Sequence, residues 1–266
     1  MRVVSLVPSL TEAIAVTAAA AARPRAHGSA RAGGTPIGLL AGVTDWCTHP
    51  ADLGGAVRIG GTKNPDVAAI VALRPDLVVA NEEENREPDL AALRAAGLDV
   101  LVTEIRTLPQ ALAELQRVLR ACGLPPRPDW LVEAEAAWAD DAAPKDAPDP
   151  SYRAVVPIWR RPWMVLGRDT FAGDLLARLG VRQLYADHPE RYPRIPLDEL
   201  NRAGADLVVL PDEPYRFTAD DGPEAFPGLP AALVGGRHLT WYGPSLAEAH
   251  RELSRELRRA VAAVRR

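Results

Sequence analysis

Short apolar runs alternate along this chain with longer segments whose apolar residues recur at helical spacing. Short continuous apolar runs are typical of strands buried in a parallel sheet, whereas recurrence every three or four residues indicates amphipathic helices. Strands are predicted at 2–7, 39–44, 76–80, 99–104, 152–159, 206–211 and 231–236. Helices are predicted at 10–22, 64–73, 87–97, 107–123, 170–180 and 245–266. This alternation predicts an α/β fold with mainly parallel sheets.

One strand motif occurs twice, as PDLVVANEEENR at 75–86 and as ADLVVLPDEPYR at 205–216. Each copy is an apolar strand that ends in an acidic, polar loop. The repeat predicts two similar Rossmann-like lobes, and a length of 266 residues fits two domains better than one. Loops at the carboxyl ends of parallel strands gather at one sheet edge, where ligands bind. We therefore expect the two loop edges to line a ligand cleft between the lobes.

The composition changes character at 124–150, which has a Pro-rich entry, one amphipathic helix near 130–142 and a Pro/Asp/Ala exit. This segment predicts a single connecting helix between an N-terminal α/β lobe, 1–123, and a C-terminal α/β lobe, 151–266. A second irregular stretch at 23–34 is rich in Gly, Ala and Arg and predicts a mobile surface insertion.

Several predicted helices carry capping residues at their ends. Gly97, Gly123 and Gly180 follow helical segments, where a residue in the left-handed conformation is expected. Ser9 or Thr11 is expected to be the N-cap of the first helix. These signals define the predicted helix boundaries.

The charge balance argues against nucleic acid as a partner, because the net charge is −4 and acids and bases are mixed along the chain. Two cysteines are too few for a disulfide framework. The first 26 residues resemble the outline of a secretory signal, but Ser9, Thr11 and Glu12 interrupt its apolar core. The chain as written is therefore expected in the cytoplasm, or outside it if the true start lies upstream. No stretch is long enough to span a bilayer.

The segment TDWCTHP at 44–50 holds a Trp, a Cys and a His directly after an apolar strand. On an extended segment Cys47 and His49 point the same way and could share a soft metal such as zinc. No second Cys/His pair follows at the spacing of a zinc finger. Two alternatives stay open: Cys47 packs as a small buried hydrophobe while His49 caps a turn, or the segment contacts a bound ligand.

The loop NEEENR at 81–86 carries three adjacent glutamates, Glu82–Glu84. These side chains repel one another, so we expect them to splay apart, with Lys63 or Arg86 compensating at least one of them. A helix that begins near Asn85 would favour this charge at its N-terminus. A pair of carboxylates can also serve acid/base chemistry, but nothing in the sequence fixes their separation.

Large aromatic rings gather in the loops that follow strands. They are Trp46, Trp159, Trp163, Tyr192, Tyr215, Trp241 and Tyr242. Rings in loops either cover a core or stack against a flat ligand. Trp46 and Tyr192 are the favoured ligand contacts, whereas Trp130 and Trp138 lie in the connecting helix and are expected to pack. Dinucleotide binding is disfavoured, because the first strand-to-helix turn, VPSLTE, contains no glycine.

Five segments together resemble the helical-backbone metal receptor family over nearly the whole chain. They are RVVSLVPSLTEAI, GVTDWCTHP, RIGGTKNPDVAAIVALRPDLVVANEEENRE, IWRRPWMVLGRDTFAGDLLARLG and LTWYGP. The family comprises the substrate-binding proteins of ABC importers for cobalamin, haem and iron–siderophore complexes, and the resemblance is closest to the cobalamin-binding branch. It implies two α/β lobes joined by one rigid helix, with the ligand held between them.

The resemblance also implies roles for individual positions. The cobalamin-contacting aromatic residues of the family correspond to Trp46 and Tyr192. Two further family tryptophans are matched by Thr62 and Asn81, which are not aromatic, so the resemblance does not fix the ligand as cobalamin.

The function expected from the resemblance is that of a monomeric small-molecule binding protein, not an enzyme. It needs no cofactor and captures a corrinoid-like, haem-like or metal-chelate ligand, with an ABC permease as a partner that docks on Asp66 and Asp198. The expected ligand contacts are Trp46, Thr62, Lys63, Asn81, Glu83, Asn85, Trp159, Tyr192, Tyr215 and Trp241. The alternative is a cytoplasmic metal-binding protein or enzyme that reuses the fold with Cys47, His49 and Glu83.

Overall fold

The computed structural model describes residues 1–22, 38–139 and 152–264. The chain divides into two compact units, each with its own sheet. Unit 1 comprises Met1–Ile105, Gln110–Val132 and Tyr242–Pro244, and unit 2 comprises Arg106–Pro109, Glu133–Trp241 and Ser245–Arg266. The predicted insertion at 23–34 and the predicted exit of the connecting segment after residue 139 lie outside the described residues.

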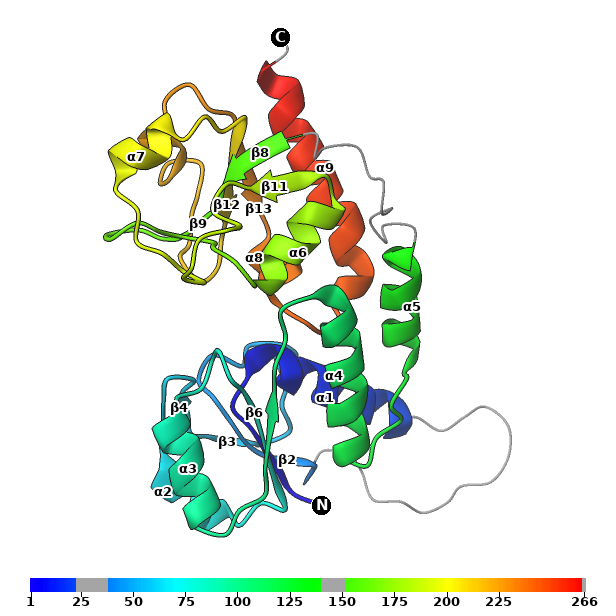
Figure 1. The fold of residues 1–266 in the computed structure, drawn as a ribbon. Coiled ribbons are helices and arrows are strands. Elements are labelled where there is room, and N and C mark those ends of the chain that lie inside the picture. Colours follow the sequence, from blue (N-terminus) through cyan, green and yellow to red (C-terminus); the bar gives the residue numbers. More distant parts are fainter. Residues whose placement is uncertain (23–37, 140–151, 265–266) are drawn as a thin grey trace. The chain divides into compact units, whose positions relative to one another are not determined.

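Unit 1 is built on a five-stranded sheet in which every neighbouring pair is parallel (Figure 1). Its strands, in spatial order, are β3 (Val57–Arg58), β2 (Leu40–Val43), β1 (Val3–Ser5), β6 (Leu77–Asn81) and β7 (Val100–Thr103). Strand β1 lies at the centre of the sheet, and all three of its residues are buried. A two-stranded antiparallel ribbon, β4 (Gly60–Gly61) and β5 (Asn64–Pro65), follows the sheet's edge strand.

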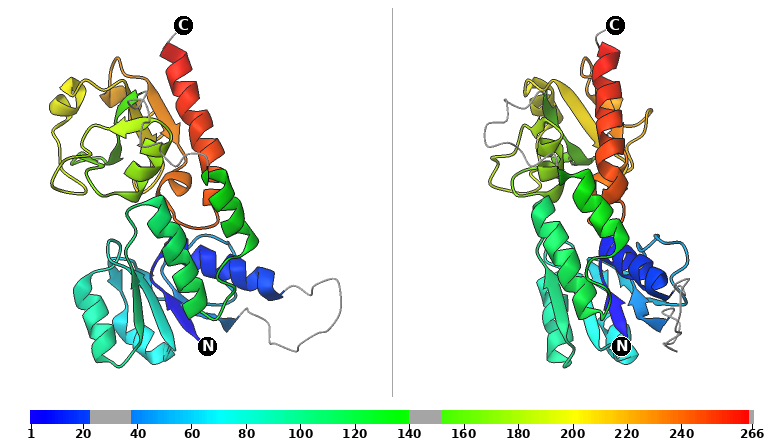
Figure 2. Two further views of the ribbon diagram at one scale, coloured as in Figure 1. Left: turned by 45° about the vertical axis from the view of Figure 1, so that its right-hand side comes forward. Right: turned by 90° about the vertical axis from the view of Figure 1, so that its right-hand side faces the viewer.

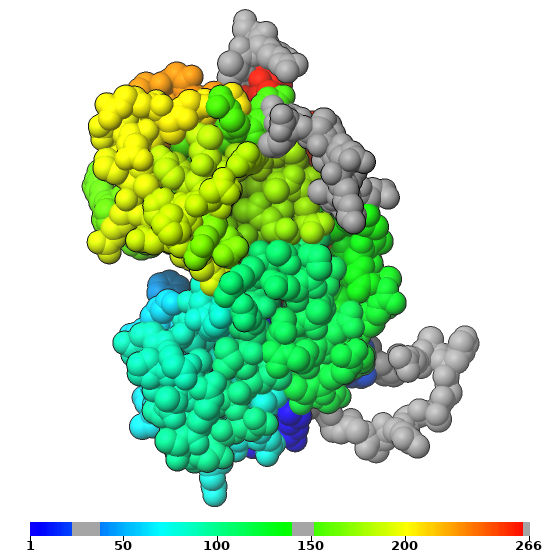
Figure 3. All heavy atoms as spheres, viewed as in Figure 1, coloured from blue at the N-terminus to red at the C-terminus, as the bar shows by residue number. Residues whose placement is uncertain are grey.

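Helices cover both faces of this sheet, which explains its continuous apolar strands. On one face α2 (Val67–Leu73) and α3 (Glu87–Ala95) bury Ile70, Leu90 and Leu93 against Val4, Val78 and Ala80. Figures 1 and 2 show α1 (Pro8–Ala22) and α4 (Leu108–Ala121) on the other side of the sheet. On the side seen in Figure 3, the surface of unit 1 comes mostly from residues of the α2 to α4 region, coloured cyan to green.

Unit 2 is built on a four-stranded parallel sheet. Its strands, in spatial order, are β11 (Val181–Gln183), β8 (Tyr152–Val155), β12 (Leu207–Pro211) and β13 (Ala231–Val234). An antiparallel hairpin, β9 (Pro157–Trp159) and β10 (Met164–Val165), continues from β8. The polypeptide thus leaves the main sheet at its carboxyl edge and turns back there.

The helices of unit 2 are α6 (Phe171–Arg178), α7 (Leu197–Arg202), α8 (Gly236–Thr240) and α9 (Leu246–Val264), with a short 3-10 helix at Pro223–Ala225. Helix α9 packs along β13 and β12 (Figure 2). The core on the α7 side joins Val155, Val208 and Leu210 to the rings of Phe217 and Phe226. None of the described helices of either unit is long and apolar enough to cross a membrane.

Helix α5 (Asp129–Ala137) contains the position where the chain passes from unit 1 to unit 2, between Val132 and Glu133. Trp130 is buried in unit 1 and donates from Nε1 to Thr17 Oγ1 at 3.0 Å. Trp138, directly after the helix, is buried in unit 2 and donates from Nε1 to the Leu246 carbonyl at 3.0 Å. The packing role predicted for both tryptophans is confirmed.

The predicted fold class is confirmed, since both main sheets are parallel and alternate with helices. Gly97, Gly123 and Gly180 have φ angles of 83°, 69° and 76°, so the predicted left-handed helix ends are also confirmed. The predicted N-cap of the first helix is wrong. Helix α1 begins at Pro8, and the Thr11 hydroxyl donates back to the Val7 carbonyl at 2.9 Å from inside the helix.

Candidate functional site

In unit 1, the loop after β2 presents the most exposed tryptophan of the described residues, Trp46, with 65% of its surface accessible. The backbone of this loop is anchored by Arg58, whose Nη1 donates to the carbonyls of Thr44 at 2.7 Å and Cys47 at 2.9 Å. Two charge-assisted bonds from one guanidinium restrain the loop on both sides of Trp46. The ring is therefore exposed on a fixed support.

Cys47 and His49, predicted to point the same way, lie in different environments. The chain bends at His49 rather than continuing extended, and Cys47 is buried while His49 is exposed. The Cys47 Sγ lies 3.2 Å from the hydroxyl oxygens of both Thr11 and Thr44, and burial raises the pKa of its thiol. The described residues contain no cluster of three or more His, Cys, Asp or Glu side chains that could hold a metal ion. This geometry supports the packing alternative for Cys47.

The loop after β6 is shaped by Asn81, which is 1% exposed. Its Nδ2 donates to Thr103 Oγ1 at 3.0 Å, and its Oδ1 accepts the backbone N–H of Glu83 at 2.9 Å and of Glu84 at 3.3 Å. Side-chain oxygens that accept following backbone N–H groups in this way fix a turn. Asn81 was expected among the ligand contacts, but its amide is committed to the loop itself.

Asn85, also expected to contact a ligand, has the same kind of role at the other end of this loop. It is 4% exposed, and its Oδ1 accepts the backbone N–H of Asn81 at 2.9 Å. Its Nδ2 donates to the carbonyls of Leu6 at 3.2 Å and Thr62 at 3.0 Å. One buried amide therefore ties the loops after β1, β4 and β6 together at the carboxyl edge of the sheet.

Lys63 and Glu83, both expected to contact a ligand, lie next to each other on this edge. Lys63 Nζ donates to the backbone carbonyl of Glu83 and not to a carboxylate. Arg86, expected to compensate one of the glutamates, instead pairs with Asp89 at 2.8 Å. The structure thus brings Thr62, Lys63 and Glu83 together above the two buried amides.

The sequence did not single out Glu84 and Tyr242 as partners. The Tyr242 Oη donates to Glu84 Oε1 at 2.9 Å within unit 1. Burial raises the pKa of Glu84 to about 7, against a lowering by the Tyr242 hydrogen bond and by the charge of Lys63. Burial also raises the pKa of the Tyr242 hydroxyl well above its ordinary value. A carboxyl group that titrates near neutral pH therefore lies in the loop after β6.

In unit 2, the exposed ring at the carboxyl edge is Trp159, at the end of β9, with 42% of its surface accessible. Its ring meets the Tyr215 ring edge to face, with 5.7 Å between centroids. The Tyr215 Oη donates to Asp221 at 2.6 Å, which raises the pKa of the tyrosine and lowers that of the carboxyl. Arg160 pairs with Asp221 and, at 2.6 Å, with Glu224. Two of the predicted ligand contacts, Trp159 and Tyr215, are thus in contact.

Behind Trp159, a chain of rings continues into the core of unit 2. Tyr215 lies 4.7 Å from Phe217, which stacks on Trp163 at 6.1 Å, and Phe226 meets Trp163 edge to face at 5.3 Å. The rings of Trp163, Phe217 and Phe226 cover the core, whereas Tyr215 is partly exposed. Trp159 is the exposed end of an otherwise packed aromatic cluster.

Trp241, another predicted ligand contact, is only 8% exposed. Its Nε1 donates to Glu213 at 2.9 Å, so it closes the loop after β12 against the end of α8. This burial supports a packing role for Trp241.

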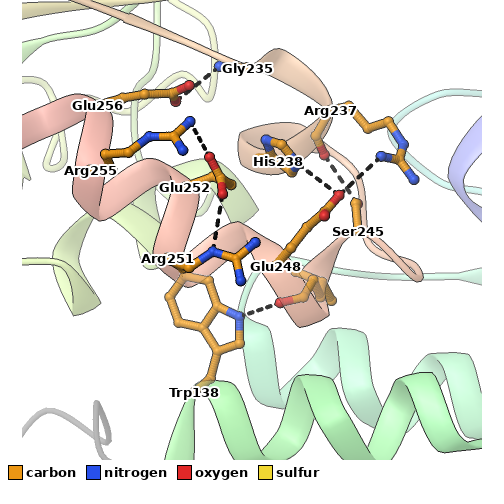
Figure 4. Close-up of polar contacts among 11 residues, drawn as sticks. Trp138, Gly235, Arg237, His238, Ser245, Glu248, Arg251, Glu252, Arg255 and Glu256 are labelled. Atoms are coloured by element: carbon orange, nitrogen blue, oxygen red, sulfur yellow. Dashed lines mark hydrogen bonds and ion pairs between the residues drawn. The ribbon is translucent and has the colours of Figure 1, made fainter.

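Figure 4 shows that the acidic side chains on one face of α9 tie down the segment containing α8. Glu256 accepts the backbone N–H of Gly235 at 3.3 Å, and Glu248 lies 3.1 Å from His238 Nε2. Glu252 pairs with Arg255 and, at 3.1 Å, with Arg251. The spacing of four residues puts these glutamates on a single helical face. The network fixes the position of α8 and of the Trp241 segment that follows.

The two acidic positions expected to dock a permease are both exposed and lie on different units. Asp66 is the N-cap of α2 and accepts the backbone N–H of Ala69 at 2.9 Å. Asp198 lies in the first turn of α7 and pairs with Arg202 at 2.6 Å. Both carboxylates thus serve local helix stability in addition to any role toward a partner.

Comparison with known proteins supports the family resemblance. No family model matches the chain. The vitamin B12-binding protein of Salmonella typhimurium is 23% identical over 182 residues, which is 67% of this chain and 66% of the relative's length. The chain thus spans about two thirds of that relative.

Solved structures share the fold over almost the whole chain. The periplasmic vitamin B12-binding protein BtuF of Vibrio cholerae has a TM-score of 0.72 at 16% identity, covering 97% of both chains. The periplasmic heme-binding protein BhuT, in complex with two hemes, has a TM-score of 0.73 at 21% identity, covering 98% of both chains. The neighbours thus include proteins named for two different ligands.

Proposed function

We propose that this chain is a solute-binding protein of an ABC importer. Its fold is that of the helical-backbone metal receptors, and vitamin B12-binding proteins are among its sequence relatives. Its ligand is a flat, metal-bearing molecule of the corrinoid or haem type. In unit 1, Trp46 offers an apolar contact, and Lys63 and Glu83 offer polar ones. In unit 2, Trp159 offers an apolar contact. No chemical conversion of the ligand is involved.

The observation that carries this proposal is the exposure of one tryptophan at the carboxyl edge of each sheet. Trp130, Trp138 and Trp241 are each no more than 9% exposed, whereas Trp46 and Trp159 are 65% and 42% exposed. Exposing a large ring to water forgoes the free energy of burying it. Both exposed rings follow strand ends, where ligands of parallel α/β folds bind.

The neighbours favour the extracytoplasmic alternative for this chain over the cytoplasmic one expected from its first residues. Both solved structures compared above are named as periplasmic proteins. An ABC permease is then the expected partner, and Asp66 and Asp198 are the acidic positions that the family resemblance assigns to docking. Exposed carboxylates on different units are compatible with that role.

Ligand titration tests the proposal. Haem, cyanocobalamin and a ferric siderophore are added to the purified protein while ligand absorbance and tryptophan fluorescence are recorded. Binding of one of them with micromolar affinity or tighter is expected. Replacing Trp46 or Trp159 by Ala should weaken it by about 2- to 12-fold, the range expected for loss of one ring contact.

Val132→Ala is the matched control, because Val132 is 42% exposed but lies on α5 away from the strand-end loops. Its affinity should equal that of the wild type. Absence of binding to all three ligands, or equal affinity of the tryptophan and control variants, would contradict the proposal.

A further inference from the structure

Strand β10 is paired on both of its sides, and the pairs place three side chains in a row. Met164 is directly opposite Trp159 of β9 and also directly opposite Arg194. The bonds from Val165 N to Pro193 O at 3.1 Å and from Ile195 N to Trp163 O at 3.2 Å flank the second pair. Met164 and Arg194 are therefore a non-hydrogen-bonded antiparallel pair, the arrangement that brings side chains closest.

The row faces away from the core of unit 2. Val165 and Ile195, the next residues along each strand, are 0% and 8% exposed and belong to the core cluster around Val155. Because side chains alternate between the faces of a strand, Met164 and Arg194 point to the opposite side. Consistent with this, Arg194 is exposed and Met164 is partly exposed.

Tyr192 belongs to the same side. The bond from Gly167 N to Arg191 O at 2.7 Å continues the antiparallel pairing toward residue 191. Pro193 and Ile195 are buried, whereas Tyr192 is partly exposed and Arg194 is exposed, so Tyr192 lies with Arg194 on the side away from the core. We call Trp159, Met164, Tyr192 and Arg194 the β10 face.

The Trp159 end of the β10 face is held rigidly. The Tyr215 ring supports Trp159, and Asp221 fixes the Tyr215 hydroxyl while itself paired with Arg160. A binding group held in position by such a supporting network loses little conformational entropy when a ligand arrives. An exposed tryptophan fixed in this way is preorganised to stack against the flat ring of a ligand.

The other end of the β10 face carries a positive charge. Within the described part of the chain, no ion pair or hydrogen bond engages the Arg194 guanidinium, in contrast to Arg160 with its two carboxylates. A guanidinium presents paired N–H donors in a plane that matches a carboxylate. Met164, between the two ends, offers a thioether that makes favourable contacts with aromatic rings.

We propose that the β10 face binds a planar macrocycle bearing a carboxylate, with its ring on Trp159, Met164 and Tyr192 and its carboxylate on Arg194. This inference rests on the proposed function and narrows its ligand to a porphyrin-type molecule. Such molecules carry acidic side chains on a flat ring, whereas the side chains of the cobalamin ring are neutral amides. Charge complementarity thus selects the carboxylated macrocycle.

The test compares protoporphyrin IX, its dimethyl ester and cyanocobalamin as probes, by quenching of tryptophan fluorescence. The wild type should bind the free acid about 10-fold or more tighter than the ester, the value of a charged hydrogen bond. Arg194→Gln should lose that factor for the acid and leave the affinity for the ester unchanged. Arg194→Lys should retain part of the preference, because the charge stays while the paired geometry is lost.

Arg182→Gln is the control for loss of one positive charge, because Arg182 is exposed on β11 and pairs with Asp187. Its affinities should match those of the wild type. Equal binding of acid and ester, an unchanged Arg194→Gln variant, or tighter binding of cyanocobalamin would overturn the inference while leaving the proposed function intact. Failure of every probe, together with failure of the siderophore, would overturn both.

Discussion

Tyr242 donates a hydrogen bond to Glu84 across 158 positions of sequence, with 2.9 Å between the Tyr242 Oη and the Glu84 Oε1. Tyr242 begins a three-residue segment, Tyr242–Pro244, that belongs to unit 1 although its neighbours on both sides belong to unit 2. The segment approaches α1 so closely that a Cβ on Gly243 would lie 3.1 Å from the Ser9 carbonyl oxygen. The bond to Glu84 therefore ties this segment to the loop after β6.

The raised pKa of Glu84 predicts a pH-dependent stability. The carboxyl holds its proton to about pH 7 in the folded protein but only to about 4.5 when unfolded. Its contribution to the free energy of unfolding is thus largest at low pH, falls between these two values and is constant above the higher one. Glu84→Gln stays neutral and keeps an acceptor for Tyr242, so it should exceed the wild type by about 1–3 kcal/mol at pH 8 and match it at pH 4. Urea denaturation across this pH range measures the difference.

Two further variants make this result specific. Glu82→Gln removes an exposed carboxylate from the same loop and should leave the wild-type pH dependence in place. Tyr242→Phe removes the bond that lowers the pKa of Glu84 in the folded protein, so the decline should begin at the same pH as in the wild type but continue to a higher pH. Parallel pH profiles for the wild type and Glu84→Gln would contradict the assignment.

Loss of Asn85 should destabilise unit 1 far more than loss of an exposed asparagine. Asn85→Ala leaves the backbone N–H of Asn81 and the carbonyls of Leu6 and Thr62 without their partner in a buried loop. Unsatisfied buried groups predict a cost of about 2–4 kcal/mol. Asn201→Ala, which also removes two bonds to backbone carbonyls but at an exposed site, should cost less than about 1 kcal/mol. Denaturant midpoints of the two variants measure this difference. Equal midpoints would contradict the structural role of Asn85.

The apolar runs predicted the longer strands because such strands are buried on both faces and show no polar interruption. The run at 76–80, for example, corresponds to β6, all five of whose residues are buried. The strand β11 and the short helices α7 and α8 were missed, because three to six residues are too few for a period to emerge. Their positions depend on tertiary contacts, such as those of α9 with Gly235 and His238 (Figure 4).

For the candidate site, the sequence indicated which aromatic rings lie near the strand ends but not how much of each ring is exposed. Trp159 ends β9 and Trp241 directly follows α8, and 42% of the first side chain but only 8% of the second is exposed. The difference depends on Glu213, which binds the Trp241 indole, and no local pattern encodes that contact. Met164 and Arg194 went unnoticed for the same reason. They meet through strand pairing at a separation of 30 residues, which only the fold determines.

Both thiols of the protein should be unreactive until it unfolds. Cys47 is 0% and Cys122 3% exposed, and burial raises the pKa of Cys122 to about 12 and also raises that of Cys47. The thiolate is the reactive species, so a thiol reagent at pH 8 should label neither cysteine in the native protein and both in denaturant. Thr48→Cys supplies an exposed thiol in the same loop as a control that should react at once. Rapid labelling of the native wild type would contradict the burial of these thiols.

Gly167 should be essential for the β10 face, because a second segment crosses its backbone directly. A Cβ at Gly167 would overlap the Glu190 carbonyl oxygen and lie 2.9 Å from the Pro193 ring and 3.1 Å from the Arg191 carbonyl oxygen. Gly167→Ala must therefore push this segment away from β10, at a cost of about 2–4 kcal/mol. Gly38→Ala, where a Cβ meets nothing within 4 Å, should have little effect.

Binding and stability together tell whether Gly167 acts on the β10 face or on the fold alone. The segment displaced by Gly167→Ala carries Tyr192 and Arg194, so the preference for protoporphyrin IX over its dimethyl ester should vanish under conditions where the variant is still folded. Circular dichroism and the denaturant midpoint establish that state before ligand is added. A folded variant that keeps the full preference would show that the position of Arg194 does not depend on this crossing.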